Sequence, residues 1–365
     1  MEIPTHNALV IVAPRAPYEV RQYPTITPTG NEVKVRVQWT TSTPFDLHQA
    51  DGGLLVEPPF RPGLSPAGVV VEVGPDVKHF RVGDAVVGFA HQQPQWKAHQ
   101  EYSTAPEWVF GKFPDTLTMQ QAVTVTEDLA TAFNTLVTDL RLPAPWPKPQ
   151  DYIPPRADER ILIWGAASCV GQVLIQVLKY YGYRHIVGTA SPHNHELLKK
   201  LGVESCFDYK SPTVIQDILR AHQQGDGPAF PLIVDCIGSQ AGSVAPVSKL
   251  AGSGATVAVM LPVIVKHATD EETPEFLMEG VEASAQWAEG VTVHGVRTFL
   301  FWKNEFFRDR LLPEIMPQLL AEGHLVPLPF QVVEGRDLLE RATNALNLVR
   351  KGVSGKKLIW RVSEE

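Results

Sequence analysis

The segment from Ile161 to Gly171 has the residue types and order of a site for a phosphate-bearing cofactor. It reads ILIWGAASCVG, an apolar run followed by a turn of small residues, and an amphipathic pattern then predicts a helix. Small side chains let the backbone approach a pyrophosphate, and the amides and dipole at a helix start attract the anion. We therefore expect these residues to bind the pyrophosphate of a nicotinamide dinucleotide: Gly165, Ala166, Ala167, Ser168, Cys169, Val170 and Gly171.

This turn is not a strict G-x-G-x-x-G, because it has two glycines, with Ala167 and Ser168 between them. A tight turn in an unrelated α/β protein would share these letters. The position of the turn favours the dinucleotide site, since it lies between a predicted strand and a predicted helix at the head of a series of such pairs.

The end of the next predicted strand indicates which dinucleotide binds. An NAD site commonly has Asp or Glu there to bind the ribose 2′-hydroxyl, whereas this strand ends in Ser191-Pro192-His193-Asn194. A hydroxyl and an imidazole suit a 2′-phosphate, so we expect NADPH at Ser191, His193 and Asn194, with Tyr209 nearby. Further cations within reach along the chain are Lys199, Lys200 and Lys210, although a lysine at the first two positions is more often a solvated helix residue.

The elements that must position this turn follow from the rhythm of the sequence. From Arg160 strands and helices alternate, which predicts a doubly wound parallel sheet. The first 110 residues are instead β-rich, with little helical periodicity before Met119. A loop with six prolines between Pro143 and Pro155 precedes the first strand of the sheet, and we expect it at the surface. After Phe299 the pattern is mixed.

Bulk composition excludes several classes of protein. The 365 residues indicate two domains, and a net charge of −8 without a basic stripe disfavours nucleic acid or an anionic membrane as partner. Three scattered cysteines do not form a disulfide framework, which favours a reducing compartment. The sequence shows neither a signal peptide nor an apolar run long enough to span a bilayer, so we expect a cytoplasmic protein.

In combination, four segments resemble the medium-chain dehydrogenase/reductase superfamily over nearly the whole chain. They are PGLSPAGVVVEVG from Pro62, FRVGDAV from Phe80, the small-residue turn with SPHN, and GVSGKKL from Gly352. The resemblance implies an α/β fold with a GroES-like β-rich catalytic domain and a doubly wound parallel Rossmann domain, and an active-site cleft at their junction. We expect residues 1–127 and 299–365 to form the catalytic domain and residues 128–298 the NADP-binding domain. The resemblance also adds Lys356 to the cofactor-binding residues.

Zinc alcohol dehydrogenases of this superfamily place a cysteine three residues before the Asp of a D-L-H-like element, and then have a G-H-E element. Here Thr43 precedes Asp46-Leu47-His48, and Gly63-Leu64-Ser65 stands at the second place. Thr and Leu are poor zinc ligands, and the lobe of four cysteines that holds a structural zinc is absent. We expect no metal.

The zinc-free branch is similar to quinone oxidoreductases and enoyl reductases. SPHN followed by LGVESCFDYKSP resembles the fungal trans-acting enoyl reductases of polyketide assembly. The resemblance implies hydride transfer from NADPH to an activated C=C bond of a small or carrier-bound substrate. It also implies a possible polyketide synthase partner, no nucleic-acid or membrane partner, and a monomer or a homodimer. A quinone reductase and a non-catalytic NADPH-binding protein remain alternatives.

By family position, Thr43, His48 and Trp96 are the candidate catalytic residues, with Phe299 or Trp302 as an apolar wall. His48 is the first choice for a polar contact to a carbonyl oxygen or carrier phosphate, although a packing histidine is an equal alternative. The chain departs from its relatives at Glu127-Asp128, where they usually have a small stretch containing Pro and Gly. These acids indicate either altered chemistry or, for Asp128 more readily, a helix cap.

Overall fold

The computed structural model describes residues 4–223, 225, 227–269 and 271–364, so the outermost residues of the two expected terminal segments lie outside it. The chain forms two compact units. Unit 1 comprises Met1–Ala130 and Phe299–Glu365, and unit 2 comprises Thr131–Thr298. The chain therefore passes between the units twice, after Ala130 and after Thr298.

Unit 2 is built on a six-stranded sheet whose strand order is β10-β9-β8-β11-β12-β15. Every neighbouring pair is parallel, and in sequence order this is the 3-2-1-4-5-6 arrangement of dinucleotide-binding folds. The strands are β8 (Arg160–Trp164), β9 (His185–Thr189), β10 (Ser205–Phe207), β11 (Leu232–Asp235), β12 (Thr256–Met260) and β15 (Thr292–Val296). The order places the reversal of direction between β8 and β11.

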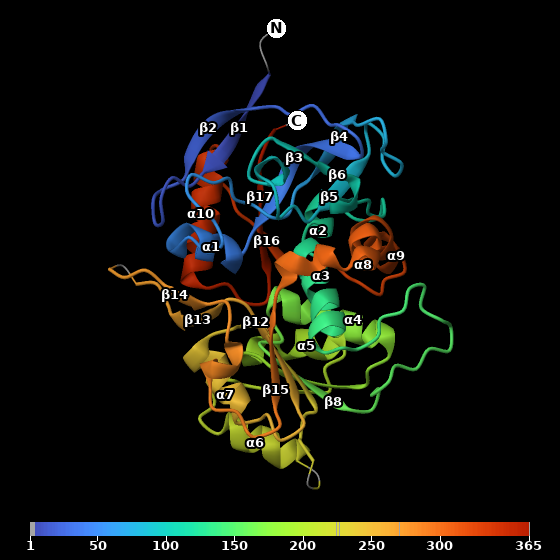
Figure 1. Ribbon diagram of the computed structural model, residues 1–365, viewed down its shortest axis with the longest axis vertical. Coiled ribbons are helices and arrows are strands. Elements are labelled where there is room, and N and C mark those ends of the chain that lie inside the picture. Colours follow the sequence, from blue (N-terminus) through green and yellow to red (C-terminus); the bar gives the residue numbers. More distant parts are fainter. Residues whose placement is uncertain (1–3, 224, 226, 270, 365) are drawn as a thin grey trace. The chain divides into compact units, whose positions relative to one another are not determined.

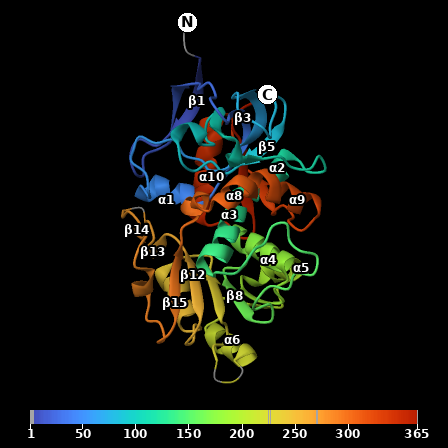
Figure 2. The ribbon, with the colours of Figure 1, turned by 45° about the vertical axis from the view of Figure 1, so that its right-hand side comes forward.

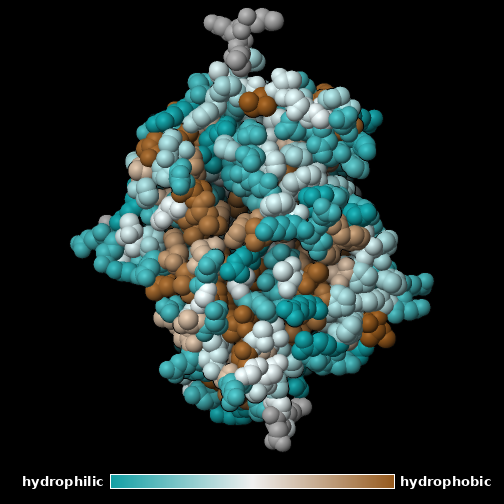
Figure 3. All heavy atoms as spheres, viewed as in Figure 1, coloured by the Kyte–Doolittle hydropathy of each residue, from teal (hydrophilic) through white to brown (hydrophobic). Residues whose placement is uncertain are grey.

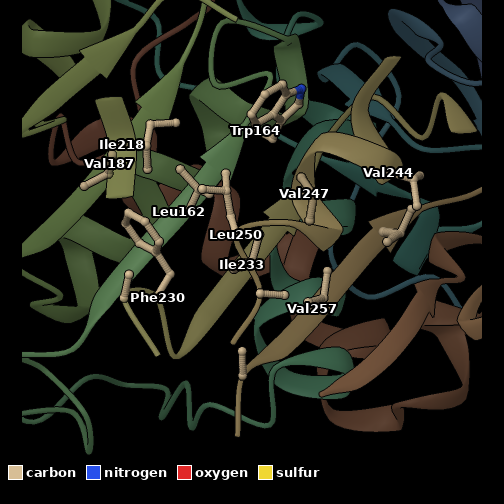
Figure 4. Close-up of a cluster of buried hydrophobic side chains, with 14 of the residues drawn as sticks. Leu162, Trp164, Val187, Ile218, Phe230, Ile233, Val244, Val247, Leu250 and Val257 are labelled. Carbon is tan, nitrogen blue, oxygen red and sulfur yellow. The ribbon is translucent and has the colours of Figure 1, made fainter. Parts of the chain in front are cut away.

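Both faces of this sheet are covered. Successive residues of a strand face opposite sides, and Ile161, Leu162 and Ile163 of β8 are all fully buried. One face packs against α6, whose Ile218 joins Leu162 and Val187 in a hydrophobic cluster (Figure 4). The helical elements of unit 2 are η3 (Thr135–Asp139), α4 (Cys169–Tyr181), η4 (Pro192–Asn194), α5 (His195–Leu201), α6 (Val214–His222), η5 (Gln240–Val244), α7 (Ala245–Ser248) and η6 (Val281–Ser284).

Two further features complete unit 2. An antiparallel hairpin of β13 (Val263–Lys266) and β14 (Glu275–Leu277) lies between β12 and β15 in the chain. The proline-rich segment before β8 is a loop, as the sequence predicts, and it is attached to α4. Lys148 donates a hydrogen bond from Nζ to the carbonyl oxygen of Tyr180 (2.6 Å) and lies over its ring.

Unit 1 is dominated by a seven-stranded sheet, in which six strands form one row and the seventh, β6, pairs with β3 beside that row. Its strand order is β16-β17-β3-β4-β5-β7, and β17, from the end of the chain, pairs antiparallel with β3, from its beginning. The strands are β3 (Glu32–Ser42), β4 (Ala67–Val73), β5 (Ala85–Gly88), β6 (Tyr102–Pro106), β7 (Phe110–Gly111), β16 (Phe330–Val332) and β17 (Lys357–Arg361), beside a hairpin of β1 (Thr5–Val10) and β2 (Glu19–Pro24).

The two distant segments of unit 1 share a hydrophobic core. Ala345 and Leu346 of α10 pack in one buried cluster with Leu9 of β1 and Trp360 of β17, and α10 lies beside α1 (Figures 1 and 2). The helical elements of unit 1 are α1 (Pro44–Gly52), η1 (Pro94–Trp96), η2 (Glu107–Val109), α2 (Met119–Ala122), η7 (Thr298–Lys303), α8 (Glu305–Arg310), η8 (Leu311–Ile315), α9 (Met316–Ala321) and α10 (Leu338–Lys351), and α3 (Thr126–Asn134) runs from unit 1 into unit 2.

On the face drawn in Figure 3, hydrophilic residues cover much of the surface, and hydrophobic residues show between them. Among the residues that the structure describes, no helix combines the length and the apolar character that crossing a membrane requires.

Candidate functional site

The turn after β8 is held in place by the neighbouring strand. The Gly165 amide donates to Thr189 Oγ1 (3.0 Å), and the Ala166 amide donates to the Thr189 carbonyl (2.9 Å). Gly165 has φ +77°, and a Cβ there would lie 2.6 Å from Ile237, so only glycine fits without strain. The anchoring role of Thr189 was not predicted from the sequence, although its position at the end of the second strand could have indicated it.

Helix α4 begins directly after this turn. Ser168 is its N-cap residue, and its Oγ accepts a hydrogen bond from the Gly171 amide (3.1 Å). Gly171 is buried, and a Cβ there would come within 2.7 Å of the Ala166 carbonyl oxygen, so the helix lies close against the turn. The predicted residues Gly165 to Gly171 thus form one compact turn and helix start, which is the geometry that binds a pyrophosphate.

The end of β11 lies beside the turn after β8, because β8 and β11 are neighbouring strands where the strand order reverses. Asp235 is fully buried, and its Oδ1 accepts hydrogen bonds from the amides of Ile237 (2.9 Å) and Gly238 (3.2 Å). Its Oδ2 accepts from Ser243 Oγ (2.7 Å), and burial raises the pKa of Asp235 to about 6. In open parallel sheets, ligands bind at such a reversal point. Asp235 was missed in the sequence, although an acid that ends the buried run LIVD is a recognisable signal.

The structure brings the residues predicted for the 2′-phosphate to the end of β9. Ser191 is half-buried at the start of η4, His193 is exposed and Asn194 is buried. The Ala190 amide donates to the Phe207 carbonyl (3.0 Å), which places the segment after β10, with Tyr209, beside the segment after β9. Tyr209 is 40 % exposed, so its ring is accessible to a ligand.

The lysines considered as contacts for the 2′-phosphate lie in different surroundings. Lys199 is exposed and forms an ion pair with Glu196 (2.8 Å) one helical turn away, as a solvated helix residue does. Lys210 Nζ lies 5.8 Å from the centre of the Tyr209 ring. Lys356 is exposed and belongs to unit 1, so the structure does not group it with the other cofactor-binding residues. Its predicted role remains a prediction.

Thr43 is the N-cap residue of α1. Its backbone amide donates to Asp46 Oδ2 (2.8 Å), its hydroxyl donates to the same oxygen (2.9 Å), and Thr43 Oγ1 accepts from the Asp46 amide. This reciprocal capping box gives the Thr43 hydroxyl a structural partner. His48 lies on the same helix and is half-buried. The structure therefore places Thr43 at the start of α1 and His48 within it, a helix that the sequence pattern did not predict.

Trp96 lies in the hydrophobic core of unit 1. Its side chain packs in a cluster with Val33, Val70 and Phe110, and its ring meets Trp108 edge-on at 5.7 Å. The indole Nε1 is buried and has no hydrogen-bond partner among the described residues. The environment of Trp96 is that of a core residue, and its predicted catalytic role remains untested.

Lys97, the next residue, was not singled out in the sequence. Its side chain is buried, and its Nζ donates to the His91 carbonyl (2.6 Å). Burial lowers the pKa of Lys97 to about 8, and the charge of Asp46 opposes this shift.

Glu127 and Asp128 form a charged cluster in the interior of unit 1. Lys357 Nζ lies 2.5 Å from Glu127 Oε1 and 2.6 Å from Asp128 Oδ2, and all three side chains are at most 10 % exposed. Since α3 begins at Thr126, Asp128 lies within its first turn and binds Lys357, which corrects the expectation that it caps the helix. Lys357 was also missed, because a lysine at the start of a terminal strand has no distinctive sequence signal.

At the two positions where zinc alcohol dehydrogenases carry Cys and His, the chain has the capping Thr43 and the buried Leu64. Among the described residues, no group of three or more His, Cys, Asp and Glu side chains could hold a metal ion.

Two protein families match this chain, and each match falls mainly within one of the two compact units. The family described as the alcohol dehydrogenase GroES-like domain matches residues 29–134, and the family described as zinc-binding dehydrogenase matches residues 169–299. The first match lies mainly in unit 1 and the second in unit 2.

Curated relatives match along nearly the full length of the chain. The trans-enoyl reductase himH of Aspergillus japonicus is 28% identical over 346 residues, which cover 91% of this chain and 90% of the relative. The enoyl reductase component lovC of the lovastatin nonaketide synthase of Aspergillus terreus is 29% identical and covers 91% and 89%. The dehydrogenase pigH of Monascus ruber is also 29% identical and covers 98% and 99%.

Solved structures share the fold. A putative zinc-dependent alcohol dehydrogenase from Rhizobium etli aligns with a TM-score of 0.74 at 21% identity, over 100% of both chains. The CurK enoyl reductase aligns with a TM-score of 0.72 at 18% identity and covers 98% of this chain and 99% of its own. The quinone oxidoreductase from Coxiella burnetii gives a TM-score of 0.69 at 21% identity and covers 99% and 100%.

Proposed function

Because the chain belongs to the medium-chain dehydrogenase/reductase superfamily, we propose that it is an NADPH-dependent, zinc-independent reductase of activated C=C bonds. The substrate class is an α,β-unsaturated carbonyl compound or enoyl thioester. The observation that carries the proposal is the turn from Gly165 to Gly171 at the strand reversal of unit 2, in a chain whose relatives include trans-enoyl reductases.

A nicotinamide dinucleotide fits the residues around this turn. Gly165 leaves room that a Cβ would fill, and α4 directs the positive end of its dipole toward the turn. The preference for NADPH rests on Ser191 and His193, where a carboxylate would repel the 2′-phosphate, with Asn194 and Tyr209 beside them. Lys356 remains a proposed further contact from unit 1.

The reaction requires little of the protein beyond orientation, exclusion of water and a donor for the developing enolate. The bound cofactor supplies the hydride, which goes to the β-carbon of the substrate. We assign the polar contact to the carbonyl oxygen to His48, which is half-buried, and Thr43 and Trp96 stay proposed neighbours of the substrate by family position alone. A proton then reaches the α-carbon, so that the product gains one hydride and one proton.

Independence from zinc is supported by the residues at the two ligand positions. The Thr43 hydroxyl is held by Asp46 in the capping box, and Leu64 has no atom that binds a metal. An enone or enoyl thioester is already polarised by its carbonyl group, so hydride transfer to it does not depend on a Lewis acid. Metal analysis of active protein should therefore give less than one zinc per ten chains.

A polyketide synthase is the proposed partner. Two relatives support it, because one is named as a trans-enoyl reductase and the other as the enoyl reductase component of the lovastatin nonaketide synthase. The substrate would then be an enoyl thioester on a carrier domain of the partner, and the protein would act on it as a monomer or homodimer.

Steady-state assays with three substrates test the proposal. We expect turnover of a short enoyl thioester with NADPH, a lower kcat/KM with NADH, and a lower kcat/KM with benzoquinone. Faster turnover of benzoquinone would favour a quinone reductase instead. Tight NADPH binding without turnover of any enoyl thioester or enone would favour a non-catalytic binding protein.

The His48→Ala variant tests the assigned contact. Loss of a hydrogen bond to the developing enolate should lower kcat by roughly 10- to 100-fold, with NADPH affinity unchanged. His79→Ala is the matched control, because His79 is also in unit 1 but is exposed and pairs with Glu107. Unchanged turnover in His48→Ala would remove His48 from the site.

A further inference from the structure

The cluster of Glu127, Asp128 and Lys357 contains more negative than positive charge. Two carboxylates share one ammonium, since one oxygen atom of each lies within 2.6 Å of the same Nζ. Lys357 is 4 % exposed at its side chain, so solvent does little to screen the cluster. With all three groups ionised, the interior of unit 1 would carry one uncompensated negative charge, which is costly in a low-dielectric environment.

The two carboxylates differ in how well their charge is stabilised. Glu127 Oε1 faces Lys357 and accepts from Thr41 Oγ1 (3.4 Å), while Oε2 accepts from Thr126 Oγ1 (2.9 Å) and from Ser65 Oγ. Burial opposes ionisation of Glu127, but Lys357, the Ser65 hydroxyl and the backbone amide of Glu127 together outweigh it and lower the pKa of Glu127. Glu127 is therefore the carboxylate that stays ionised.

Asp128 has fewer donors. Within the part of the chain that the structure describes, its hydrogen-bond partner is Lys357, through Oδ2. Burial raises the pKa of Asp128 to about 6; Lys357 opposes this shift and the negative charge of Glu127 adds to it. These two are the charged groups that face Asp128, one from β17 and one from its own helix. Protonation of Asp128 leaves a neutral Glu127–Lys357 pair.

Asp128 lies in α3, close to the point where the chain passes from unit 1 into unit 2. Asp128 lies three residues before Thr131, one turn along α3, and α3 continues from unit 1 into unit 2 at this point. The Thr131 hydroxyl accepts a hydrogen bond from Thr298 Oγ1 (3.2 Å), and Thr298 is the last residue before the chain returns to unit 1. The two passages of the chain are thus joined one helical turn from the cluster.

We propose that Asp128, Glu127 and Lys357 form a buried proton-exchange site, in which Asp128 takes up and releases one proton while its two partners stay charged. Its charge alternates between −1 and 0 as the pH falls, and the proton comes from solvent. We further propose that this alternation sets the pH dependence of the reduction, a part that rests on the proposed function.

Infrared titration of the protein without substrate tests the proton exchange. Between pH 5 and 7.5, roughly the range set by the raised pKa, buried carboxyl groups lose their protonated carbonyl stretch, and Asp128 should account for one of them beside Asp139 and Asp235. The difference spectrum between the unmodified protein and Asp128→Asn should therefore contain one carbonyl band that disappears over this range, and Asp235→Asn should keep that band while losing its own. A titrating band intensity that is the same in Asp128→Asn and in the unmodified protein would overturn the proposal.

Thermal unfolding gives a second, independent measurement. A carboxyl whose folded pKa is raised favours the folded state when protonated, so its ionisation removes stability as pH rises from about 4 to 6. Asp128→Asn should therefore melt higher than the unmodified protein at pH 7.5, and this difference should vanish near pH 4. Glu127→Gln should melt lower at pH 7.5, since it loses a well-stabilised carboxylate. A lower melting temperature of Asp128→Asn at pH 7.5 would contradict the proposal.

Turnover separates this inference from the proposed function. The pH profile of kcat/KM for an enoyl thioester should have an inflection near pH 6 that Asp128→Asn removes, while NADPH affinity stays unchanged. An identical inflection in both proteins would refute the link to the reduction. Absence of turnover in the unmodified protein would refute the proposed function, and the infrared and unfolding measurements would still decide whether Asp128 exchanges a proton.

Discussion

The turn after β8 in unit 2 and the charged cluster in unit 1 are built from different parts of the chain. The turn is shaped by backbone atoms and by the lack of side chains, since Gly165 is held through its amide and leaves open the place of a Cβ. The cluster is shaped by charged side chains from α3 and β17, 229 residues apart for Asp128 and Lys357. The turn therefore depends on the absence of a side chain at Gly165 and on hydrogen bonds of its own backbone. The cluster depends on the balance of charge between segments that are distant in sequence.

Removing Lys357 should have the largest effect, because the cluster depends on a single cation. Lys357→Met leaves two buried carboxylates without a counter-charge, and breaking a buried ion pair typically costs about 3–5 kcal/mol. The free energy of unfolding, measured by urea denaturation, should fall by this amount. Lys356→Met is the matched control, since Lys356 is the adjacent residue and is exposed. Equal effects of the two variants would show that the cluster adds no stability.

Filling the space at Gly165 should have the next largest effect, on cofactor binding. Gly165→Val places a branched side chain against Ile237 at φ +77° and should weaken NADPH binding by about 100-fold, or 2.7 kcal/mol. Gly254→Val is a matched control in the same unit, with φ +86° and no atom within 4 Å of its Cβ position. Titration of cofactor fluorescence measures both. A similar loss in the control would show that backbone strain alone, rather than occupied space, weakens binding.

A negative charge at Ser191 should have a smaller and more selective effect. Ser191→Asp should weaken NADPH binding by roughly 10- to 30-fold through repulsion of the 2′-phosphate, and it should leave NADH binding nearly unchanged. Ser253→Asp introduces the same charge just before β12, at the amino ends of the parallel strands, whereas Ser191 follows the carboxyl end of β9. If NADH binds the unmodified protein more tightly than NADPH does, the assignment of this pocket is wrong.

The smallest expected effect is protection of Cys169 by the cofactor. Cys169 is half-buried in the first turn of α4, whereas Cys236 is buried and burial raises the pKa of Cys206 to about 11. Alkylation should therefore report mainly on Cys169, and saturating NADPH should slow it a few-fold. Cys169→Ser should lose the fast phase. A rate that NADPH does not change would place the dinucleotide away from this turn.

The fold of unit 2 could be predicted because its signals are local. The central strands β8 and β11 are buried on both faces and therefore read as continuous apolar runs, ILIW and LIVD. The strand β15 was not predicted, because its sequence TVHGV is not a continuous apolar run and contains a glycine. Medium-chain membership and the doubly wound α/β fold were both confirmed.

Unit 1 was predicted less completely, for two physical reasons. Helix α1 was missed because its apolar residues do not follow a helical period, although Thr43-Pro44 and Asp46 are the signals of a capped helix start. The segment after Phe299, where the sequence pattern is mixed, contains α8, η8 and α9 in one uninterrupted helical run. Pro313 and Pro317 lack an amide hydrogen, so this run is not a regular α-helix and contains the π-helical η8.

In the candidate site, contacts between neighbours in sequence could be predicted, whereas contacts between distant residues could not. The residues of the small-residue turn are neighbours in sequence, so their proximity follows from the local pattern. The pairing of Lys357 with Glu127 and Asp128 depends on β17 joining β3 at the end of the chain, which single-sequence patterns do not reveal. The acids were recognised as unusual, but their partner was not.

The attachment of the proline-rich loop to α4 has a consequence for handling the protein. Lys148 and Tyr152 contact Tyr180 and Tyr181 at the last turn of this helix, whose first turn is the candidate pyrophosphate site. A segment that looks in sequence like a place to cut or to insert a tag is therefore part of the support of that helix. Proteases should cleave there slowly, and insertions there should disturb dinucleotide affinity from the far end of the helix.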